Sequence, residues 1–388
     1  MESQQFLFPK GFLWGAATSA HQVEGNHDND WTEWEKEGHP ISGHACDHYN
    51  RFREDFDIAR SLGHNAHRFS LEWSRIEPQE GIFDEKEIAH YREVIAALRE
   101  RGMEPFVTLW HWTLPLWMRD KGGVASREFP RFFARFAERM AKEYKDDARF
   151  WITINEPMIW TTNAYLRGIW PPQKKSVVEF FHVVQHLIKA HRQAYRSIHA
   201  VYANKQKGRR VHVGIAKNNS FFEGWAAPLV RWFWNHWFLN RIADRHDFIG
   251  LNYYFHNHIK GLQFNQNESK DVSDMGWEIY PEGIYHVLCD LKKYHKPIYI
   301  TENGIADAKD VKRTDFIRDH LRFTLKALRS GADVRGYFYW SLLDNFEWDK
   351  GFDPRFGLVE MDYQTMERHI RPSARAYCDI IQTNGSDL

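Results

Sequence analysis

Eight short apolar segments alternate with longer amphipathic segments along the chain, and this alternation limits the possible folds more than any other feature. The apolar segments are rich in β-branched and aromatic residues, as buried parallel strands are. They span residues 12–17, 66–70, 105–110, 150–155, 211–216, 247–252, 297–302 and 334–340. Segments such as 86–101 and 129–144 place charges on one face of a helix and apolar side chains on the other. Eight such repeats predict an α/β fold, one (β/α)8 TIM barrel.

No linker rich in Gly, Pro or Ser divides the chain, and barrels of this class often exceed about 250 residues as one domain. We therefore expect residues 1–388 to form a single domain. Within it, residues 171–208 are predicted to be a loop followed by a long helix. The basic sequence KQKGRR at 205–210 is predicted to be a solvated turn without a function of its own.

Two glutamates stand at the carboxyl ends of predicted strands: Glu156 in FWITINEP and Glu302 in PIYITENG. Barrel enzymes carry their catalytic residues at this end of the strands. A facing pair of carboxyl groups performs glycoside hydrolysis, in which one protonates the leaving oxygen and the other attacks the sugar or activates water. A Glu before Pro or Asn-Gly is also typical of a solvated turn, so either site alone is weak. Two such sites favour a sugar-cleaving enzyme.

Other strand ends supply hydrogen-bonding and aromatic side chains. Aromatic residues make up 16% of the chain, including 17 Trp, and aromatic rings stack on the apolar faces of sugars. The candidates at these positions are Gln22, Arg68, His111, Trp112, Asn155, Tyr254, Trp340, Glu347 and Trp348. Alternatives stay open for three of them. His111 also suits a hydrogen-bonded core histidine, Trp340 suits barrel filling, and Arg68 suits an ion pair with Glu72.

Composition excludes several classes of partner. Lys and Arg together number 52, as do Asp and Glu, and the basic residues are dispersed, so we expect neither nucleic acid nor a membrane as partner. Cys46, Cys289 and Cys378 are too far apart and too few for a disulfide framework. No stretch approaches the length of a membrane span, and no signal segment is evident. We therefore expect a cytoplasmic protein.

One local cluster looks like a metal site. His44, Cys46 and His48 alternate in sequence, a spacing found at some zinc sites. These residues precede a predicted helix, however, and no further His, Asp or Glu arrangement completes a metal site. No glycine loop that would cradle a phosphate occurs either. We expect no metal and no cofactor.

The motifs taken together resemble the retaining β-glycosidases of glycoside hydrolase family one. The resemblance begins at FLWGAATSAHQVEG, continues through NAHRFSLEWSRIEP, TLWHWTLP, TINEP, GLNYY and ITENG, and ends at YFYWSLLDNFEWDKGFDPRFG. It covers essentially the whole chain. TINEP and ITENG in this order, with DNFEW downstream, are specific, whereas any one motif alone is weak. The resemblance also accounts for the ACDHY segment, which is a common variant in the family.

This resemblance implies roles for the candidate residues. Glu156 is the general acid/base, Glu302 is the nucleophile, and Arg68 and Tyr254 bond the nucleophile. The implied sugar contacts are Asn155 at the 2-hydroxyl, Gln22, His111, Trp112, Glu347 and Trp348 at the other hydroxyls, Trp340 under the ring and Phe356 at its far side. A cation and a phenol beside Glu302 would lower its pKa, and the resulting charge would raise the pKa of Glu156.

Three departures or exclusions follow from the same comparison of motifs. The family usually has Tyr where His67 stands, so we expect a titratable group that alters local pH dependence. The chain is several dozen residues shorter than typical members, mostly between Glu156 and Tyr254, which predicts a shallower, more open cleft. Glu347 would repel a phosphate, which favours an unphosphorylated sugar.

The leading hypothesis is hydrolysis of terminal non-reducing β-D-glycosides with retention of configuration. The expected substrates are small-molecule β-glycosides or short oligosaccharides: β-glucosides, and also β-galactosides or β-fucosides. The binding residues do not choose among these sugars, and the sequence does not define the oligomeric state. Two alternatives stay open: a transglycosidase that uses the same residues, and a catalytically inactive carbohydrate-binding barrel.

Overall fold

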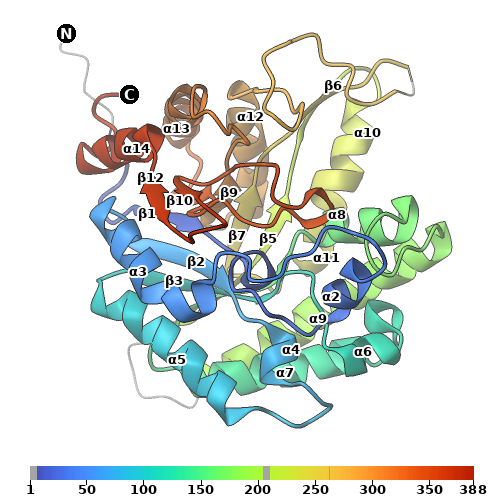
Figure 1. The fold of residues 1–388 in the computed structure, drawn as a ribbon. Helices are drawn as coiled ribbons and strands as arrows, with labels where there is room; N and C mark the ends of the chain where they lie inside the picture. The colour runs from blue at the N-terminus through green and yellow to red at the C-terminus, as the bar shows by residue number, and fades with distance from the viewer. Residues whose placement is uncertain (1–6, 204–209, 262) are drawn as a thin grey trace.

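Eight parallel strands close into a barrel in the computed structural model, which describes residues 7–203, 210–261 and 263–388 (Figure 1). The strand order is β1-β10-β9-β7-β5-β4-β3-β2, with β1 pairing β2 to close the circle. The barrel strands are β1 (Leu13–Ala17), β2 (Ala66–Ser70), β3 (Glu104–Trp110), β4 (Phe150–Asn155), β5 (His212–Asn218), β7 (Phe248–Asn252), β9 (Ile298–Asn303) and β10 (Val334–Trp340). The predicted (β/α)8 barrel is confirmed, and the predicted segments fall on these strands with ends that differ by at most two residues.

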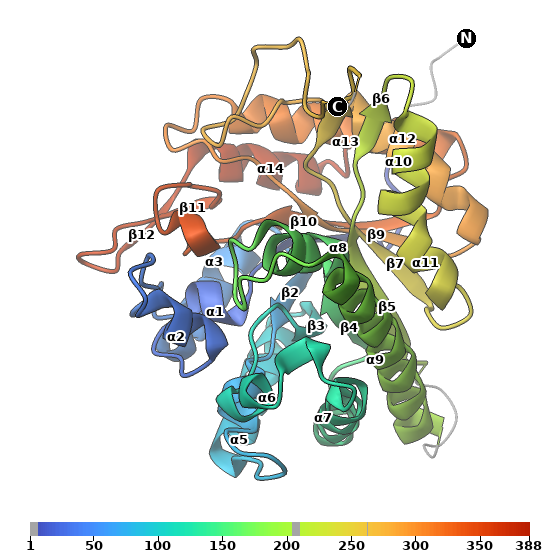
Figure 2. The ribbon, with the colours of Figure 1, turned by 90° about the vertical axis from the view of Figure 1, so that its right-hand side faces the viewer.

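Helices surround the barrel (Figure 1). The longer ones are α3 (His48–Ser61), α5 (Glu85–Glu100), α7 (Phe129–Tyr144), α9 (Val177–Ala203), α12 (Glu282–Leu291), α13 (Arg313–Arg329) and α14 (Pro372–Gln382). Figure 2 shows α9 alongside α7, beside β4 and β5. The long helix expected within 171–208 is α9, whereas the basic turn at 205–210 lies almost entirely outside the described residues.

Shorter elements occupy the connections between strands and helices. The α-helical ones are α1 (Ala20–Val23), α2 (Asp30–Glu35), α4 (Trp73–Ile76), α6 (Leu116–Asp120), α8 (Pro157–Thr161), α10 (Ala227–Arg231) and α11 (Trp237–Ile242). Turns of 3-10 or π geometry are η1 (Gly123–Ala125), η2 (Thr162–Arg167), η3 (Trp232–His236), η4 (Lys292–Tyr294) and η5 (Trp348–Lys350). Two small sheets pair β6 (Phe221–Glu223) with β8 (His256–His258) and β11 (Val359–Met361) with β12 (Arg368–Ile370).

Helix ends follow the local sequence. The side chain of Asp84 accepts a hydrogen bond from the amide of Lys86 at 2.8 Å, so it caps the exposed amides at the start of α5. Helix α7 begins with Pro130 in its first turn, where the missing N–H has no helical partner to lose. These signals place both helices where the amphipathic pattern predicts them.

Apolar side chains fill two layers. The barrel interior holds mainly aromatic and small residues: Ala17, Ala66, Phe106, Phe150, Ile152, Ala216, Phe248, Tyr299, Phe338 and Trp340. A larger layer lies between the strands and the helices. The interior is therefore solid below the strand ends, and polar side chains meet at the carboxyl end.

One glycine fixes the approach of two neighbouring strand ends. A Cβ atom on Gly304 would lie 1.8 Å from the carbonyl oxygen of Trp340, so only glycine fits there. This contact packs the segment after Glu302 tightly against the end of β10.

No helix within residues 7–203, 210–261 and 263–388 is both long and apolar enough to cross a membrane.

Candidate active site

Glu302 lies at the end of β9, between a cation and a phenol. Arg68 on β2 donates from Nη1 to Oε1 of Glu302 at 2.5 Å, and Tyr254 donates its hydroxyl to Oε2 at 2.9 Å. Both the guanidinium group and the carboxylate are buried, at 1% and 4% exposure. The alternative pairing of Arg68 with Glu72 is wrong, because Glu72 accepts from Ser74 and Thr113 instead.

Glu156 follows β4 in a left-handed conformation, with φ of 42°. Its amide donates to the carbonyl oxygen of Ala216 at 2.8 Å, which fixes the turn against β5. Its carboxyl group accepts from Nδ2 of Asn252 at 2.9 Å. Asn252 in turn accepts from Thr301 Oγ1 at 2.7 Å. An amide on β7 therefore joins Glu156 to the strand that carries Glu302.

The two carboxyl groups have unequal surroundings. Burial, followed by the charge of Glu302, raises the pKa of Glu156 to about 8, which keeps this group protonated at neutral pH. Burial also raises the pKa of Glu302, against the opposing effects of Arg68 and Tyr254. The expectation of a lowered pKa for Glu302 was wrong, because desolvation of the carboxylate outweighs its two partners. Glu302 is nevertheless the group that ionises first, since it alone has a cation at hydrogen-bond distance.

Asn155 organises the floor of the site. Its Oδ1 accepts from Nη2 of Arg68 at 2.7 Å, its Nδ2 lies 3.0 Å from Nε2 of His111, and its carbonyl accepts from the indole of Trp112 at 2.9 Å. Burial lowers the pKa of His111 well below its usual value, so the imidazole is neutral. Nδ1 of His111 is buried without a partner among the described residues. His111 is therefore not a fully satisfied core histidine.

Gln22 and the segment after β10 form another wall. Nε2 of Gln22 donates to the carbonyl of Phe346 at 2.8 Å and to Oε2 of Glu347 at 3.3 Å. Burial and then the charge of Glu302 raise the pKa of Glu347 to about 8. The ring of Trp348 stacks on His21, with centroids 5.4 Å apart and planes inclined by 7°. Aromatic and polar surfaces thus alternate along this wall.

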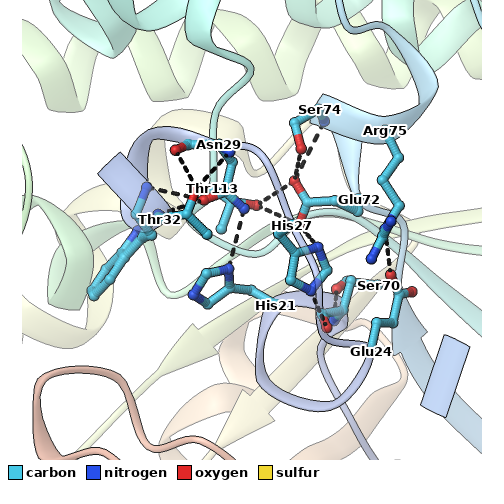
Figure 3. Close-up of polar contacts among 12 residues, drawn as sticks. His21, Glu24, His27, Asn29, Thr32, Ser70, Glu72, Ser74, Arg75 and Thr113 are labelled. Atoms are coloured by element: carbon cyan, nitrogen blue, oxygen red, sulfur yellow. Dashed lines mark hydrogen bonds and ion pairs between the residues drawn. The ribbon is translucent and has the colours of Figure 1, made fainter. Parts of the chain in front are cut away.

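Figure 3 shows a polar network that reaches this wall through His21. The side chains of Glu72, Ser74 and Thr113 point toward one another, and Thr113 Oγ1 lies 3.0 Å from Glu72 Oε2. His21, which stacks on Trp348, lies 3.1 Å from Asn29 Nδ2 through its Nδ1. The network therefore ties the loop after β1 to the loops after β2 and β3.

These walls enclose a cavity of about 1000 Å³. Its lining includes both catalytic candidates and most of the predicted sugar contacts: Gln22, His111, Trp112, Glu156, Tyr254, Glu302, Trp340, Glu347, Trp348 and Phe356. Arg68 and Asn155 are not among the lining residues, but they contact Glu302 and His111, which are. Trp340 faces the cavity, so it does more than fill the barrel. The structure brings every sequence-predicted site residue to one place.

The potential metal ligands do not converge. His48 bonds Asp55 at 2.7 Å, and the thiol of Cys46 donates to the carbonyl of Asp344 at 3.0 Å. His44 pairs with Asn26 at the surface. Across the part of the chain that the structure describes, no three His, Cys, Asp or Glu side chains gather as a metal site would require.

The expectation for His67 was also wrong. The ring is fully buried and contacts Thr18 Oγ1 at 3.2 Å, and burial lowers its pKa well below the usual value. A histidine in this state does not change charge near neutral pH. His67 therefore adds no titration to the site.

Two buried polar residues, Asn252 and Lys217, were not among the predicted site residues. Asn252 ends a predicted strand, but an amide at that position carries no pattern that assigns it to Glu156. Lys217, near the end of β5, is 1% exposed. It directly follows the predicted apolar strand 211–216, and a charged residue at that position is the one signal that could have marked it.

Comparison with known proteins agrees with this geometry. The family model for glycosyl hydrolase family 1 matches residues 4–243 and 238–386. The 1,4-beta-D-glucan glucohydrolase of Thermotoga neapolitana is 34% identical over an alignment of 447 positions, which covers 97% of this chain and 99% of that protein.

Solved structures share the fold. The beta-glycosidase from Pyrococcus horikoshii has a TM-score of 0.91 and 40% identity, covering 98% of this chain and 96% of its own. The beta-glucosidase from Thermotoga maritima, solved in complex with noeuromycin, has a TM-score of 0.91 and 32% identity, covering 98% and 99% of the two chains. With these matches and the two buried glutamates at the barrel mouth, the chain belongs to glycosyl hydrolase family 1 and is a glycoside-cleaving enzyme.

Proposed function

We propose that the protein hydrolyses terminal non-reducing β-D-glycosides with retention of configuration, β-glucosides first and also β-galactosides or β-fucosides. The observation that carries this proposal is the unequal surroundings of the two glutamates. Glu302 has Arg68 and Tyr254 as partners, which favour its ionised form. Glu156 has one neutral amide donor and a raised pKa. One nucleophile and one acid are the pair that a retaining mechanism requires.

In the first half of the reaction, the carboxylate of Glu302 attacks the anomeric carbon as the bond to the leaving oxygen breaks. Glu156 gives its proton to that oxygen, so the leaving group departs as a neutral alcohol. The product on the enzyme is a glycosyl ester of Glu302, which carries no charge. Loss of that charge makes Glu156 more acidic, and its carboxylate form is then suited to take a proton from water. Water attack releases the sugar and restores both groups.

The remaining site residues would hold the sugar. We assign Asn155 to the 2-hydroxyl, where a contact strengthens as the transition state forms. The other proposed contacts are Gln22, His111, Trp112, Glu347 and Trp348 at hydroxyl groups, Trp340 beneath the ring and Phe356 at its far side. His111 lines the cavity, and its Nδ1 has no protein partner among the described residues, which supports a ligand contact.

The first test is release of nitrophenol from aryl β-glucoside, β-galactoside and β-fucoside by wild type and Glu302→Ala. We expect turnover by wild type, a loss of several orders of magnitude in the variant, and rescue by azide to a glycosyl azide of inverted configuration. Glu360→Ala, at an exposed glutamate on β11, is the matched control and should retain activity. No turnover on any glycoside with sugar binding intact would favour the inactive binding barrel. Product analysis with an added alcohol separates transglycosylation from hydrolysis.

We also propose a cytoplasmic location. It rests on the low cysteine content, and Cys46, Cys289 and Cys378 are free thiols in the structure. Fractionation of the source cells tests it, and recovery in a secreted fraction would contradict it.

A further inference from the structure

Lys217 is a buried lysine outside the residues that the proposed reaction uses. It lies next to last in β5, where Val213 and Ile215 pack into the layer between the barrel and the helices and Ala216 faces the barrel interior. Alternation along the strand therefore points Lys217 outward, under the surrounding helices. Only 1% of the residue is exposed, so its ammonium group is out of contact with bulk water.

This ammonium group has few partners. Its Nζ donates to the carbonyl oxygen of Asn218 at 2.5 Å and lies 5.6 Å from the ring centre of Trp234. No carboxylate among the described residues lies within ion-pair distance of it. Burying a lone ammonium group is unfavourable, and burial lowers the pKa of Lys217 to about 7. A buried group whose charged form is disfavoured in this way is a candidate for a functional role.

The neighbours of Lys217 belong to the active site. Asn218 and Trp234 both line the cavity, and the indole of Trp234 donates to Oδ1 of Asn218 at 3.3 Å. The preceding residue, Ala216, accepts the amide of Glu156. Strand β5 therefore links Lys217 to the turn that carries Glu156 through one backbone hydrogen bond of the adjacent residue. A negative charge on Glu156 favours the protonated form of Lys217.

Charged and titratable groups reach Glu156 from several elements. Glu302 on β9 and Glu347 after β10 oppose its ionisation, and the phenol of Tyr254 is nearby. Arg68 on β2 and Lys217 on β5 favour its ionisation. Arg68 is already committed to Glu302 by a direct ion pair. Lys217 is thus the cation left to act on Glu156.

We propose that Lys217 is a positioning residue for the acid/base half of the reaction: its ammonium group orients Asn218 and Trp234 behind Glu156 and stabilises the carboxylate that remains after proton donation. This inference rests on the acid/base role proposed for Glu156. When Glu156 gives its proton to the leaving oxygen, the new negative charge increases the proton affinity of Lys217. The charge of each group therefore favours the charge of the other, and the two groups titrate as a pair.

The test compares Lys217→Met, Lys217→Gln and Lys217→Arg with wild type. Met keeps the length of the side chain, Gln keeps a donor for the Asn218 carbonyl without a charge, and Arg keeps the charge. The pH profile of kcat/KM on an aryl β-glucoside measures the alkaline limb, and thermal unfolding checks that each variant is folded. Lys326→Met, at an exposed lysine on α13, is the control.

We expect the alkaline limb to move to higher pH by at least about 0.5 unit in the Met and Gln variants and to stay near wild type in the Arg variant. An alkaline limb that is the same in all variants would overturn the proposal. Equal shifts in all three variants would assign Lys217 a packing role only, which also overturns it.

A second readout does not depend on turnover. The 13C NMR titration of the Glu156 carboxyl carbon, assigned with Glu156→Gln, should have its midpoint raised in Lys217→Met. An unchanged midpoint would refute the electrostatic role of Lys217. Wild type that titrates as expected but hydrolyses no glycoside would refute the proposed function and leave the pairing of Lys217 with Glu156 standing.

Discussion

Removal of the Tyr254 hydroxyl tests how the charge of Glu302 is maintained. In Tyr254→Phe the ring stays, but the bond of 2.9 Å to Oε2 of Glu302 is lost. A hydrogen bond to a charged group contributes about 1.5–3 kcal/mol, and about 1.4 kcal/mol corresponds to one pKa unit. The full bond is therefore equivalent to about 1–2 units. Because water in the cavity replaces part of it, we expect a rise of about 1 unit in the pKa of Glu302.

The sign follows from the role of Glu302. The carboxylate must be ionised to attack, so kcat/KM falls as the pH drops through its pKa in the free enzyme. Loss of a donor that stabilises the ionised form raises this pKa. Activity should then be lost at higher pH on the acidic side. The assay is kcat/KM for an aryl β-glucoside from about pH 4 to pH 8.

Tyr253→Phe is the matched control. Its hydroxyl donates to the carbonyl of Tyr280 at 2.8 Å, away from the two glutamates. This control should lower the thermal midpoint without moving the acidic limb. An acidic limb that does not move in Tyr254→Phe, or that moves equally in both variants, would refute the electrostatic reasoning.

Two further variants test other parts of the structure. Gly304→Ala places a Cβ atom 1.8 Å from the carbonyl oxygen of Trp340. We therefore expect the free energy of unfolding, measured with urea, to fall by about 3 kcal/mol and kcat to be lower. A variant as stable as wild type would contradict the close approach. His67→Gln removes an imidazole that is already neutral, so both limbs of the pH profile should stay in place. A shift of either limb would mean that His67 carries a charge in the working enzyme.

Much of the site could be predicted because it sits on strands with clear patterns. The segments before Glu156 and Glu302 are short, apolar and β-branched, and parallel strands in a closed barrel bring their carboxyl ends together. Once the fold was predicted, proximity of the two glutamates followed. The roles of Arg68 and Tyr254 needed the resemblance to a family, because an arginine or tyrosine at a strand end has many other uses.

The parts that could not be predicted depend on tertiary surroundings. Positive φ values occur at Trp112, Glu156 and Trp348. No local sequence pattern predicts a positive φ for a bulky residue. The direction of the pKa shift of Glu302 depends on how completely burial excludes water from its carboxylate, and the sequence does not give the extent of this burial. Strands of three residues such as β6 and β8 are too short to show a period. Lys217 lies just beyond the predicted strand 211–216, and nothing in the sequence indicates that its ammonium group is buried.

The contact between Gln22 and Glu347 has a consequence for biosynthesis. These residues are 325 positions apart, and strands β1 and β10 form the seam that brings them together. The ribosome synthesises the chain from its N-terminus. The wall formed by Gln22 and Glu347 can therefore assemble only after nearly the whole chain has been made. A ribosome-bound chain that ends before β10 can carry both Glu156 and Glu302 and still lack the sugar pocket. Glycosidase activity should therefore appear only at the end of translation.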